Sequence, residues 1–507
     1  MCKVHIFYQN HGENLGAEMI KYTSTKQLSI EAFKTPFYYG LDKNNRWARL
    51  AQQIPWDEFA KIYAKALCEE FGRPALDARV VIGAMIIKYK KGLSDEETIE
   101  EIKENAYLQY FIGYEEFSHK APFDPSLFVT LRERLGVDVF EQLTHAFMAG
   151  VQKAEAEQKK PSKSKDHSET EQPDRQGKLI LDASVAPQDI KFPTDLDLLN
   201  DSREHTERII DTLWQPGPGK RKPRTYRRIA RKDYLTLAKM KKKSAKTLRA
   251  GIRKQLNYVR RNIQTIKKLI DPKLGKSSSL NAPDLKTFLV VQEIYRQQKK
   301  MYDNQQHQIS DRIVSVSQPY VRPIVRGKSG KSTEFGAKIS VSLANSYVFL
   351  DHLDWDAFNE SLDLKNQVER YRERFGFYPE EVIADKIYGS RDNRDYLKKR
   401  KIEFSGRSLG RPPRLTDEEA RVARKRLKEH GRLRNQIEGK FGEGKRKYDL
   451  DCVKAKTRRT SESWIAAVFF VMNLAHWLRM SSFLSLFRWL ENFKERLLSR
   501  PKFSFAC

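Results

Sequence analysis

Three carboxylates stand on segments that are predicted to be rigid and that lie far apart along the chain. Asp182 follows the apolar run Lys178-Leu-Ile-Leu, Asp385 follows Glu381-Val-Ile-Ala, and Glu438 lies in a helical stretch, 434–445. Hard divalent cations such as Mg²⁺ bind carboxylate oxygens and keep positions for water and phosphate oxygens. Two such ions can assist an in-line displacement at phosphorus with water or a 3′-hydroxyl as nucleophile. The three residues therefore predict a metal-dependent phosphoryl-transfer site.

Cations flank the glutamate on its helix. Arg434 precedes Glu438 by four residues and Lys445 follows it by seven, so the three side chains share one helix face. Such cations favour the charged carboxylate and could hold DNA phosphates beside the metal, as could the neighbouring Arg446. The same spacing also fits ordinary ion pairing on a solvated helix. Three glycines in this stretch each cost roughly 1 kcal/mol relative to Ala, which favours close approach of a bulky partner; they are Gly439, Gly442 and Gly444.

The charge of the chain indicates a polyanionic partner. The 507 residues carry a formal net charge of +29, more than solubility requires, which favours nucleic acid. Residues 220–268 hold twenty Lys or Arg and one acid, Asp233, with apolar residues at helical spacing. This basic segment predicts contact with the DNA backbone, and a solvated face or a membrane-surface helix are the alternatives. The predicted DNA-contact residues in it are Arg227, Arg228, Arg231, Lys241 and Lys242.

The elements that must position these residues alternate between helix and strand. Residues 1–150 read as a separate all-α domain, which we expect to bind DNA ends, and 151–177 as a polar linker. Residues 178–480 read as a catalytic α/β domain with a mixed strand and helix order, interrupted by a helical insertion at about 200–310. Its predicted strands include Ile313-Val-Ser-Val, and 481–507 is expected to be a C-terminal helix and tail.

The cysteines and apolar runs indicate a cytoplasmic protein. Cys2, Cys68, Cys452 and Cys507 are too widely spaced for a zinc knuckle or a redox pair. The first residues lack the apolar stretch of a signal peptide. The longest apolar run, 464–478, is short for a bilayer and contains Asn473 and His476, so it reads as a buried helix. We expect no membrane association.

These motifs resemble bacterial insertion-sequence transposases of the DDE type. Arg434, Glu438 and Lys445 fit the family spacing of Arg, three residues, Glu, six residues, Lys. Further likeness lies in Leu-Ile-Leu-Asp182-Ala-Ser-Val, Ile383-Ala-Asp385-Lys-Ile-Tyr388-Gly-Ser-Arg, Gly72-Arg-Pro74, Asp124-Pro-Ser126 and Glu334-Phe-Gly-Ala-Lys338, and covers about residues 50 to 480. One departure is Gly431, which stands where the family often has Tyr.

The resemblance implies a ribonuclease H-like core whose mixed sheet is flanked by helices. It implies that Asp182, Asp385 and Glu438 bind Mg²⁺ or Mn²⁺, as two ions, and catalyse cleavage at the inverted repeats of a mobile element, followed by joining of the 3′-hydroxyl ends to target double-stranded DNA. It also implies a homodimer or higher multimer on the DNA and a location at the bacterial nucleoid. The alternatives are an inactive or domesticated DNA-binding descendant, a metal-dependent nuclease for hybrids or junctions, and a basic RNA scaffold.

Overall fold

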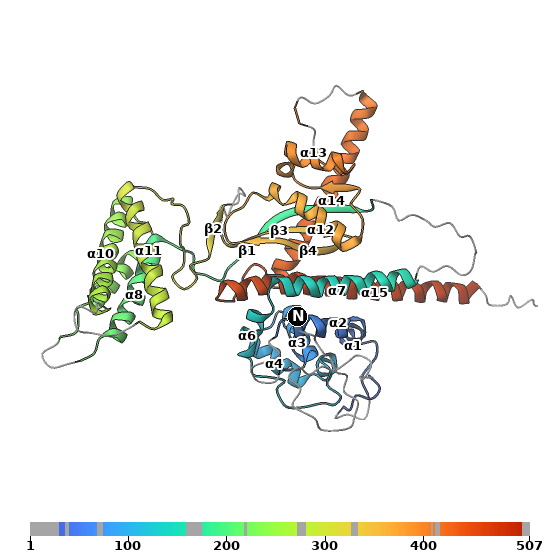
Figure 1. Ribbon diagram of the computed structural model, residues 1–507, viewed down its shortest axis with the longest axis horizontal. Coiled ribbons are helices and arrows are strands. Elements are labelled where there is room, and N and C mark those ends of the chain that lie inside the picture. Colours follow the sequence, from blue (N-terminus) through green and yellow to red (C-terminus); the bar gives the residue numbers. More distant parts are fainter. Residues whose placement is uncertain are drawn as a thin grey trace, which may run out of the picture.

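The computed structural model describes residues 30–35, 40–67, 75–158, 175–216, 221–270, 280–325, 333–406, 409–410 and 416–498, with side chains given except at 154–158 and 481–498. Within this part the chain forms a group of N-terminal helices, a mixed sheet and a helical insertion that stands to one side of the sheet (Figure 1). No helix in the described ranges is long and apolar enough to cross a bilayer.

The N-terminal region is helical because its turns are well capped and its apolar faces meet. The Ser94 hydroxyl accepts from the Glu97 amide at 3.1 Å, and the Glu97 carboxylate accepts from the Ser94 amide at 2.8 Å, which completes a capping box. The helices are α1 (Arg46–Gln53), α2 (Trp56–Lys65), α3 (Ala78–Lys91), α4 (Asp95–Glu104), α5 (Ala106–Phe111), α6 (Leu127–Arg134) and α7 (Val137–Gln158).

The last of these helices extends into the segment that the sequence predicts to be a linker. α7 runs to Gln158, eight residues into the segment 151–177. Residues 152–158 are Gln, Lys, Ala and Glu, which have high helix propensity even where they are polar. Residues 159–174 lie outside the described part of the chain.

The sheet is mixed, as the strand and helix order predicts. Strand β3 pairs antiparallel with β1, β2 and β4, whereas β5 lies parallel to β1 and β6 lies parallel to β5. The order is β2-β3-β1-β5-β6, with β4 beside β3, and 3-10 turns η3 (Glu360–Leu362) and η4 (Lys386–Tyr388) and helices α12 (Leu364–Phe375) and α13 (Arg391–Lys399) lie in the connections. The strands are β1 (Lys178–Pro187), β2 (Arg322–Val325), β3 (Thr333–Ala344), β4 (Tyr347–Asp354), β5 (Glu381–Ile383) and β6 (Glu403–Phe404).

One predicted strand is wrong. Residues Ile313 to Val316 pair with no strand in the described chain. Ile313 and Val316 instead lie in the hydrophobic core of the helical insertion. Their alternating apolar pattern is therefore explained by packing against helices.

The insertion is a four-helix unit with its own core. Its helices are α8 (Asp195–Leu213), α9 (Arg227–Ala238), α10 (Ala245–Ile270) and α11 (Ala282–Asn304). The apolar faces of α8, α10 and α11 form a cluster that includes Leu199, Ile210, Val259 and Val291, and α9 packs against α10 and α8. The basic segment is helical, as predicted, but it is interrupted at 239–244, where Lys241, Lys242 and Lys243 follow one another and repel.

Two long helices complete the fold. Helix α14 (Asp417–Lys447) crosses β1 and β5, and α15 (Arg458–Leu498) contacts α3, α6, α7 and β4. Asn473 of α15 donates to the Val348 carbonyl at 2.7 Å and accepts from the Val348 amide at 2.8 Å, which fixes α15 on β4. The N-terminal helices and the sheet consequently share one hydrophobic core. The predicted boundary at 480 falls inside α15.

We predict that His476 makes stability pH-dependent. Its ring lies edge-on to Tyr347 of β4, with centroids 5.1 Å apart. Burial, helped by Lys440 and Arg479, lowers the pKa of His476 from 6.5 to about 4. The folded state therefore stays neutral where the unfolded state takes up a proton, so this stability is present above pH 6.5 and is lost towards pH 4.

The expected loss is up to about 3 kcal/mol, at roughly 1.4 kcal/mol per pKa unit, reduced by the partial exposure of the ring. Urea unfolding between about pH 7 and pH 4 measures it, with His476→Phe as the control that keeps the ring contact. If the variant loses stability as steeply as the wild type, His476 is not the titrating group.

Candidate active site

Two neighbouring parallel strands bring the aspartates to the same end of the sheet. Ile180 of β1 pairs with Ile383 of β5, the last pair between these strands. Asp182 and Asp385 each lie two residues further along, a step that keeps side chains on one face of an extended chain. The apolar run before Asp182 suggests a strand that ends in this carboxylate, but the strand continues: Asp182 lies in the middle of β1 and is paired with Val341 of β3. It is β5 that ends, and its departure leaves one edge of β1 open beside Asp182.

Arg434 joins the second aspartate to the glutamate. Its Nη1 lies 3.3 Å from Oδ1 of Asp385, and its Nη2 lies 3.7 Å from Oε1 of Glu438. The exposed fractions of the two carboxylates are 53% and 57%, so these ion pairs are weak and exchangeable. The Nε of Arg434 is buried and has no hydrogen-bond partner among the described residues. The guanidinium thus retains a donor for a further acceptor.

Asp182 is the least solvated of the three carboxylates. Burial raises the pKa of Asp182 above its usual 3.8, and Glu360 and Glu438 add to the increase. A hydrogen bond from the Ala183 amide to Oδ1, 2.9 Å long, and the charge of Arg434 act in the opposite direction. These effects place Asp182 within electrostatic reach of both Arg434 and Glu438. A bound cation would relieve the penalty on its charged form.

An ionic cluster at the start of β5 holds α14 in place. The buried carboxylate of Glu381 lies 2.8 Å from Nε2 of His430, 3.1 Å from Nζ of Lys178 and 3.2 Å from Nη2 of Arg426. Burial raises the pKa of Glu381, but hydrogen bonds from Lys178 and Arg426 outweigh it and keep the pKa below its usual value. The cluster fixes the first buried turn of α14, two turns before Glu438. The buried stripe continues through Ile437, Phe441 and Gly444.

The other predicted cations of α14 do not join the carboxylates. Lys445 is directed to β3, where its Nζ lies 3.8 Å from Oε1 of Glu334. Arg446 is exposed. Of the three residues in the Arg–Glu–Lys motif, the structure therefore brings only Arg434 and Glu438 into contact with each other.

Within the described ranges, no three His, Cys, Asp or Glu side chains are close enough together to hold a metal ion. Arg434 lies between two of the predicted ligands, which accounts for their separation. The donor set nevertheless suits a hard divalent cation, since all three side chains offer carboxylate oxygens. The raised pKa of Asp182 is a second sign, because the carboxylate lacks a close cationic partner of its own.

Sequence reasoning missed two residues near Asp182. Glu360 raises the pKa of Asp182 and pairs with Lys338 of β3, whose Nζ lies 3.3 Å from its Oε1. Glu360 begins a single 3-10 turn after an irregular loop, so neither periodicity nor a motif distinguishes it. Lys338 belongs to the family-like stretch Glu334-Phe-Gly-Ala-Lys338, but its sequence context gives no sign of its pairing with Glu360.

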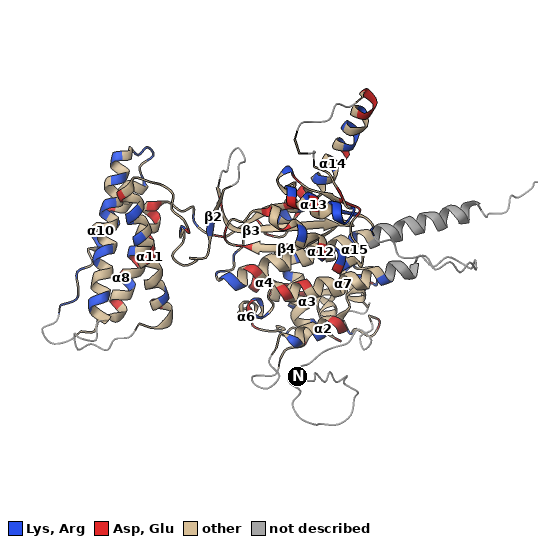
Figure 2. Ribbon diagram, turned by 45° about the horizontal axis from the view of Figure 1, so that its top comes forward, with Lys and Arg blue, Asp and Glu red and all other residues tan. Residues whose placement is uncertain are grey.

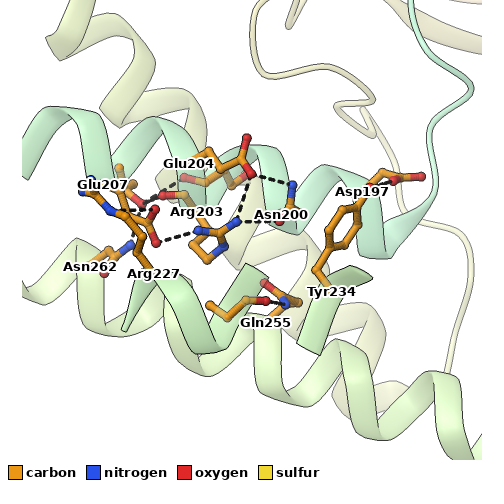
Figure 3. A network of polar contacts seen from close by, with 12 residues as sticks. Asp197, Asn200, Arg203, Glu204, Glu207, Arg227, Tyr234, Gln255 and Asn262 are labelled. Atoms are coloured by element: carbon orange, nitrogen blue, oxygen red, sulfur yellow. Dashed lines mark hydrogen bonds and ion pairs between the residues drawn. The ribbon is translucent and has the colours of Figure 1, made fainter. Parts of the chain in front are cut away.

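The predicted DNA contacts on the insertion differ in their surroundings. Arg227 is 48% exposed but belongs to an ion-pair network (Figure 3), where its guanidinium lies 2.7 Å from Asp211 and 3.5 Å from Glu207. Arg203, almost fully buried, pairs with the same Glu207 at 2.7 Å. The other four predicted contacts are exposed and form no ion pair with a described acid; they are Arg228, Arg231, Lys241 and Lys242. Figure 2 shows Lys and Arg, in blue, along the helices of the insertion.

Comparison with known proteins identifies the class of protein. Residues 36–134 match a transposase domain of the DUF772 type, and residues 382–475 match a transposase DDE domain. The second match includes Asp385 and Glu438 but not Asp182. Together the two matches place the chain among insertion-sequence transposases of the DDE type, which confirms the resemblance seen in its motifs.

One curated relative also matches. It is an uncharacterized protein of Rhizobium meliloti, ORF8 in the nfe locus, and is 34% identical over 148 residues. The match covers 29% of this chain and 64% of the relative, so the chain spans less than two thirds of that protein. No solved structure matches the chain.

We predict that Asp182→Asn stabilises the metal-free protein at neutral pH. The folded state keeps the Asp182 proton to a higher pH than the unfolded state does, so wild-type stability falls as pH rises through that window. Asparagine cannot ionise and retains the oxygen that accepts from the Ala183 amide. Melting in EDTA at pH 4 and pH 7 measures the effect. A variant no more stable than the wild type at pH 7 would show that burial does not strain this carboxylate.

Proposed function

We propose that the protein is an active transposase that cuts the ends of a mobile DNA element and joins them to target DNA. Asp182, Asp385 and Glu438 are the proposed catalytic residues. The observation that carries the proposal is Arg434, which contacts Asp385 and Glu438 and acts electrostatically on Asp182. Two of the carboxylates thereby meet at one guanidinium, whose charge also acts to lower the pKa of the third. The strand order, antiparallel on one side of β1 and parallel on the other, supports a ribonuclease H-like core.

The same three carboxylates would hold Mg²⁺ or Mn²⁺, as two ions according to the family resemblance. When bound, the cations would supply Lewis acidity to the phosphate and to the attacking and leaving oxygens. Arg434 would turn its free Nε donor and its exchangeable Nη donors to phosphate oxygens, because arginine binds phosphate in a bidentate manner. Lys445 and Arg446 would contact the same strand further along α14.

The proposed reaction has two displacements. In the first, a water oxygen bonds to phosphorus, the bond from phosphorus to the 3′-oxygen breaks, and the water proton is balanced by the proton gained at the new 3′-hydroxyl. In the second, that 3′-hydroxyl attacks a phosphorus of the target and releases a target oxygen, which takes up the proton. Neither step needs a covalent enzyme intermediate.

The remaining partners follow from the same proposal. Phosphate contacts position DNA without reading its sequence, so the basic segment cannot select the element ends. We place recognition of the terminal inverted repeats in the N-terminal helices. The exposed cations of the insertion would grip the duplex backbone. Two DNA ends would be held by a homodimer or higher multimer, at the nucleoid in the cytoplasm.

The decisive experiment is metal-dependent nicking of DNA that carries the element ends. We expect Asp182→Asn, Asp385→Asn and Glu438→Gln each to reduce cleavage by at least 100-fold with Mg²⁺, because each removes an anionic metal ligand, while DNA binding in EDTA persists. Glu418→Gln, at an exposed residue in the first turn of the same helix, is the matched control and should cleave normally.

Two results would refute the proposed site or function. Full cleavage by Glu438→Gln would remove that residue from the site. End-specific binding without cleavage by the wild type under any divalent metal would favour a DNA-binding descendant of a transposase, and cleavage without end specificity would favour a general nuclease.

A second prediction separates structural from DNA-contacting cations on the insertion. Arg228→Gln should lower the slope of log K against log salt by about 0.9, as expected for one lost phosphate contact, with unchanged melting. Arg227→Gln should instead destabilise the insertion, since Glu207 and Asp211 lose a partner, and amide exchange in α8 should increase. Equal effects of both substitutions on binding and on exchange would contradict this division.

A further inference from the structure

The first half of α14 projects from the body of the protein (Figure 1). From Asp417 to Glu429 every side chain is exposed except Ala420, which is half-buried, and His430 is the first buried residue. The acidic residues of this half lie in its first turn, apart from Glu429. In Figure 2 the projecting half carries red at its tip and blue along its length.

Five cations of this half form a row. Arg421, Arg424, Lys425, Lys428 and Arg432 follow at steps that place them on one face of a helix. None of the five pairs with an acid in the described chain. Arg426 differs, since it points to the sheet and contacts Glu381 and Glu403.

The row is costly in the free protein. Arg421 and Lys425, Arg424 and Lys428, and Lys428 and Arg432 are like charges four residues apart, each pair of which destabilises a helix. An ordinary solvated face would alternate acids with bases at this spacing. A row of one sign instead complements a polyanion.

The same face continues along α14 on both sides of Glu438, and two of its four further residues are glycines. Asn435, Gly439, Gly442 and Arg446 extend the row at steps of three and four residues. A Cβ at Gly439 would meet nothing within 4 Å, and the same holds for Gly431. Protein packing therefore does not require glycine at either position, although glycine lowers helix stability. A bare backbone permits close approach from outside the chain.

We propose that this face, from Arg421 to Arg446, is a second DNA-docking surface, the α14 ridge, and that it binds the phosphate backbone of duplex DNA next to the cleaved bond. The inference rests on the proposed transposase function and identifies where the duplex lies. At about 1.5 Å per residue the ridge is roughly 38 Å long. This length corresponds to about 11 base pairs at 3.4 Å each. The cations lie on the rigid helix that carries Glu438, so the contacts would place the duplex relative to that carboxylate.

The test compares two double variants of the full-length protein that lose the same charge. Lys425→Gln with Lys428→Gln alters the ridge, whereas Lys398→Gln with Lys399→Gln alters two exposed lysines of α13. Binding of an end-bearing duplex is measured in EDTA over a series of salt concentrations. We expect the ridge variant to lower the slope of log K against log salt by about 1.8, at about 0.9 per phosphate contact, and the α13 variant to leave it unchanged. Equal slopes for the two variants, or a loss confined to single-stranded DNA, would overturn the proposal.

Gly439→Ala gives a second readout that a purely structural role would not produce. Alanine has the higher helix propensity and meets no neighbour, so the melting temperature should rise while duplex affinity falls several-fold. Unchanged or stronger binding would contradict close approach at this position. Binding in EDTA does not involve cleavage, so the two proposals can fail separately. If the wild type cleaves but the ridge variants bind DNA normally, only the proposal for the α14 ridge is refuted. Ridge-dependent binding without any cleavage refutes only the catalytic proposal.

Discussion

The geometry of the candidate site depends on one buried carboxylate, that of Glu381. A desolvated negative charge is stable only when cations and hydrogen bonds surround it, and here these come from β1 and from α14 through Lys178, Arg426 and His430. The requirement ties a long helix to the strand that ends beside Asp182. With its buried turn held there, the regular rise of the helix carries Arg434 and Glu438 to the end of β5. Loss of the cluster would leave this part of α14 held mainly by the apolar contacts of Ile437, Phe441 and Gly444, which do not fix its direction as closely.

The two hydrophobic cores divide the protein mechanically. α15 packs against the sheet and against the N-terminal helices, so the segment that matches the DUF772 transposase domain and the segment that matches the DDE domain share one core. The insertion has a core of its own and is joined to the sheet by the segments that leave β1 and approach β2. Ion pairs between its helices, such as that of Arg227 in α9 with Asp211 in α8, hold the insertion together without help from the sheet. Within the described residues, those connections are the route by which a partner bound to the insertion would act on the sheet.

The types of the site residues could be predicted from sequence, whereas their spatial relations could not. Asp182, Asp385 and Glu438 are distinguished by apolar runs and by a helix motif, which are local. That Asp182 lies inside its strand depends on pairing with β3, more than 150 residues away, and no local pattern contains that information. Ile313 and Val316 show the same limit, because alternation fits a strand but their partners are helices of the insertion. The prediction for Arg227 failed to separate it from Arg228 for a related reason, since Asp211 approaches only after α8 and α9 pack.

The free protein carries electrostatic strain of both signs, one on β1 and one on α14. Asp182 is an anion penalised by burial, and the α14 ridge is a row of cations that repel one another. Neither arrangement stabilises the fold, and either could be relieved by a single substitution. Each matches one component of a phosphoryl-transfer complex, the anion a metal ion and the cations a phosphate backbone. A bound metal ion would reduce the electrostatic penalty on Asp182, and bound phosphates would reduce the repulsion between the ridge cations. Arg434 contacts Asp385 and Glu438 and so lies between the two. Arrival of DNA phosphates would draw its guanidinium from the carboxylates and so leave their oxygens free for the metal.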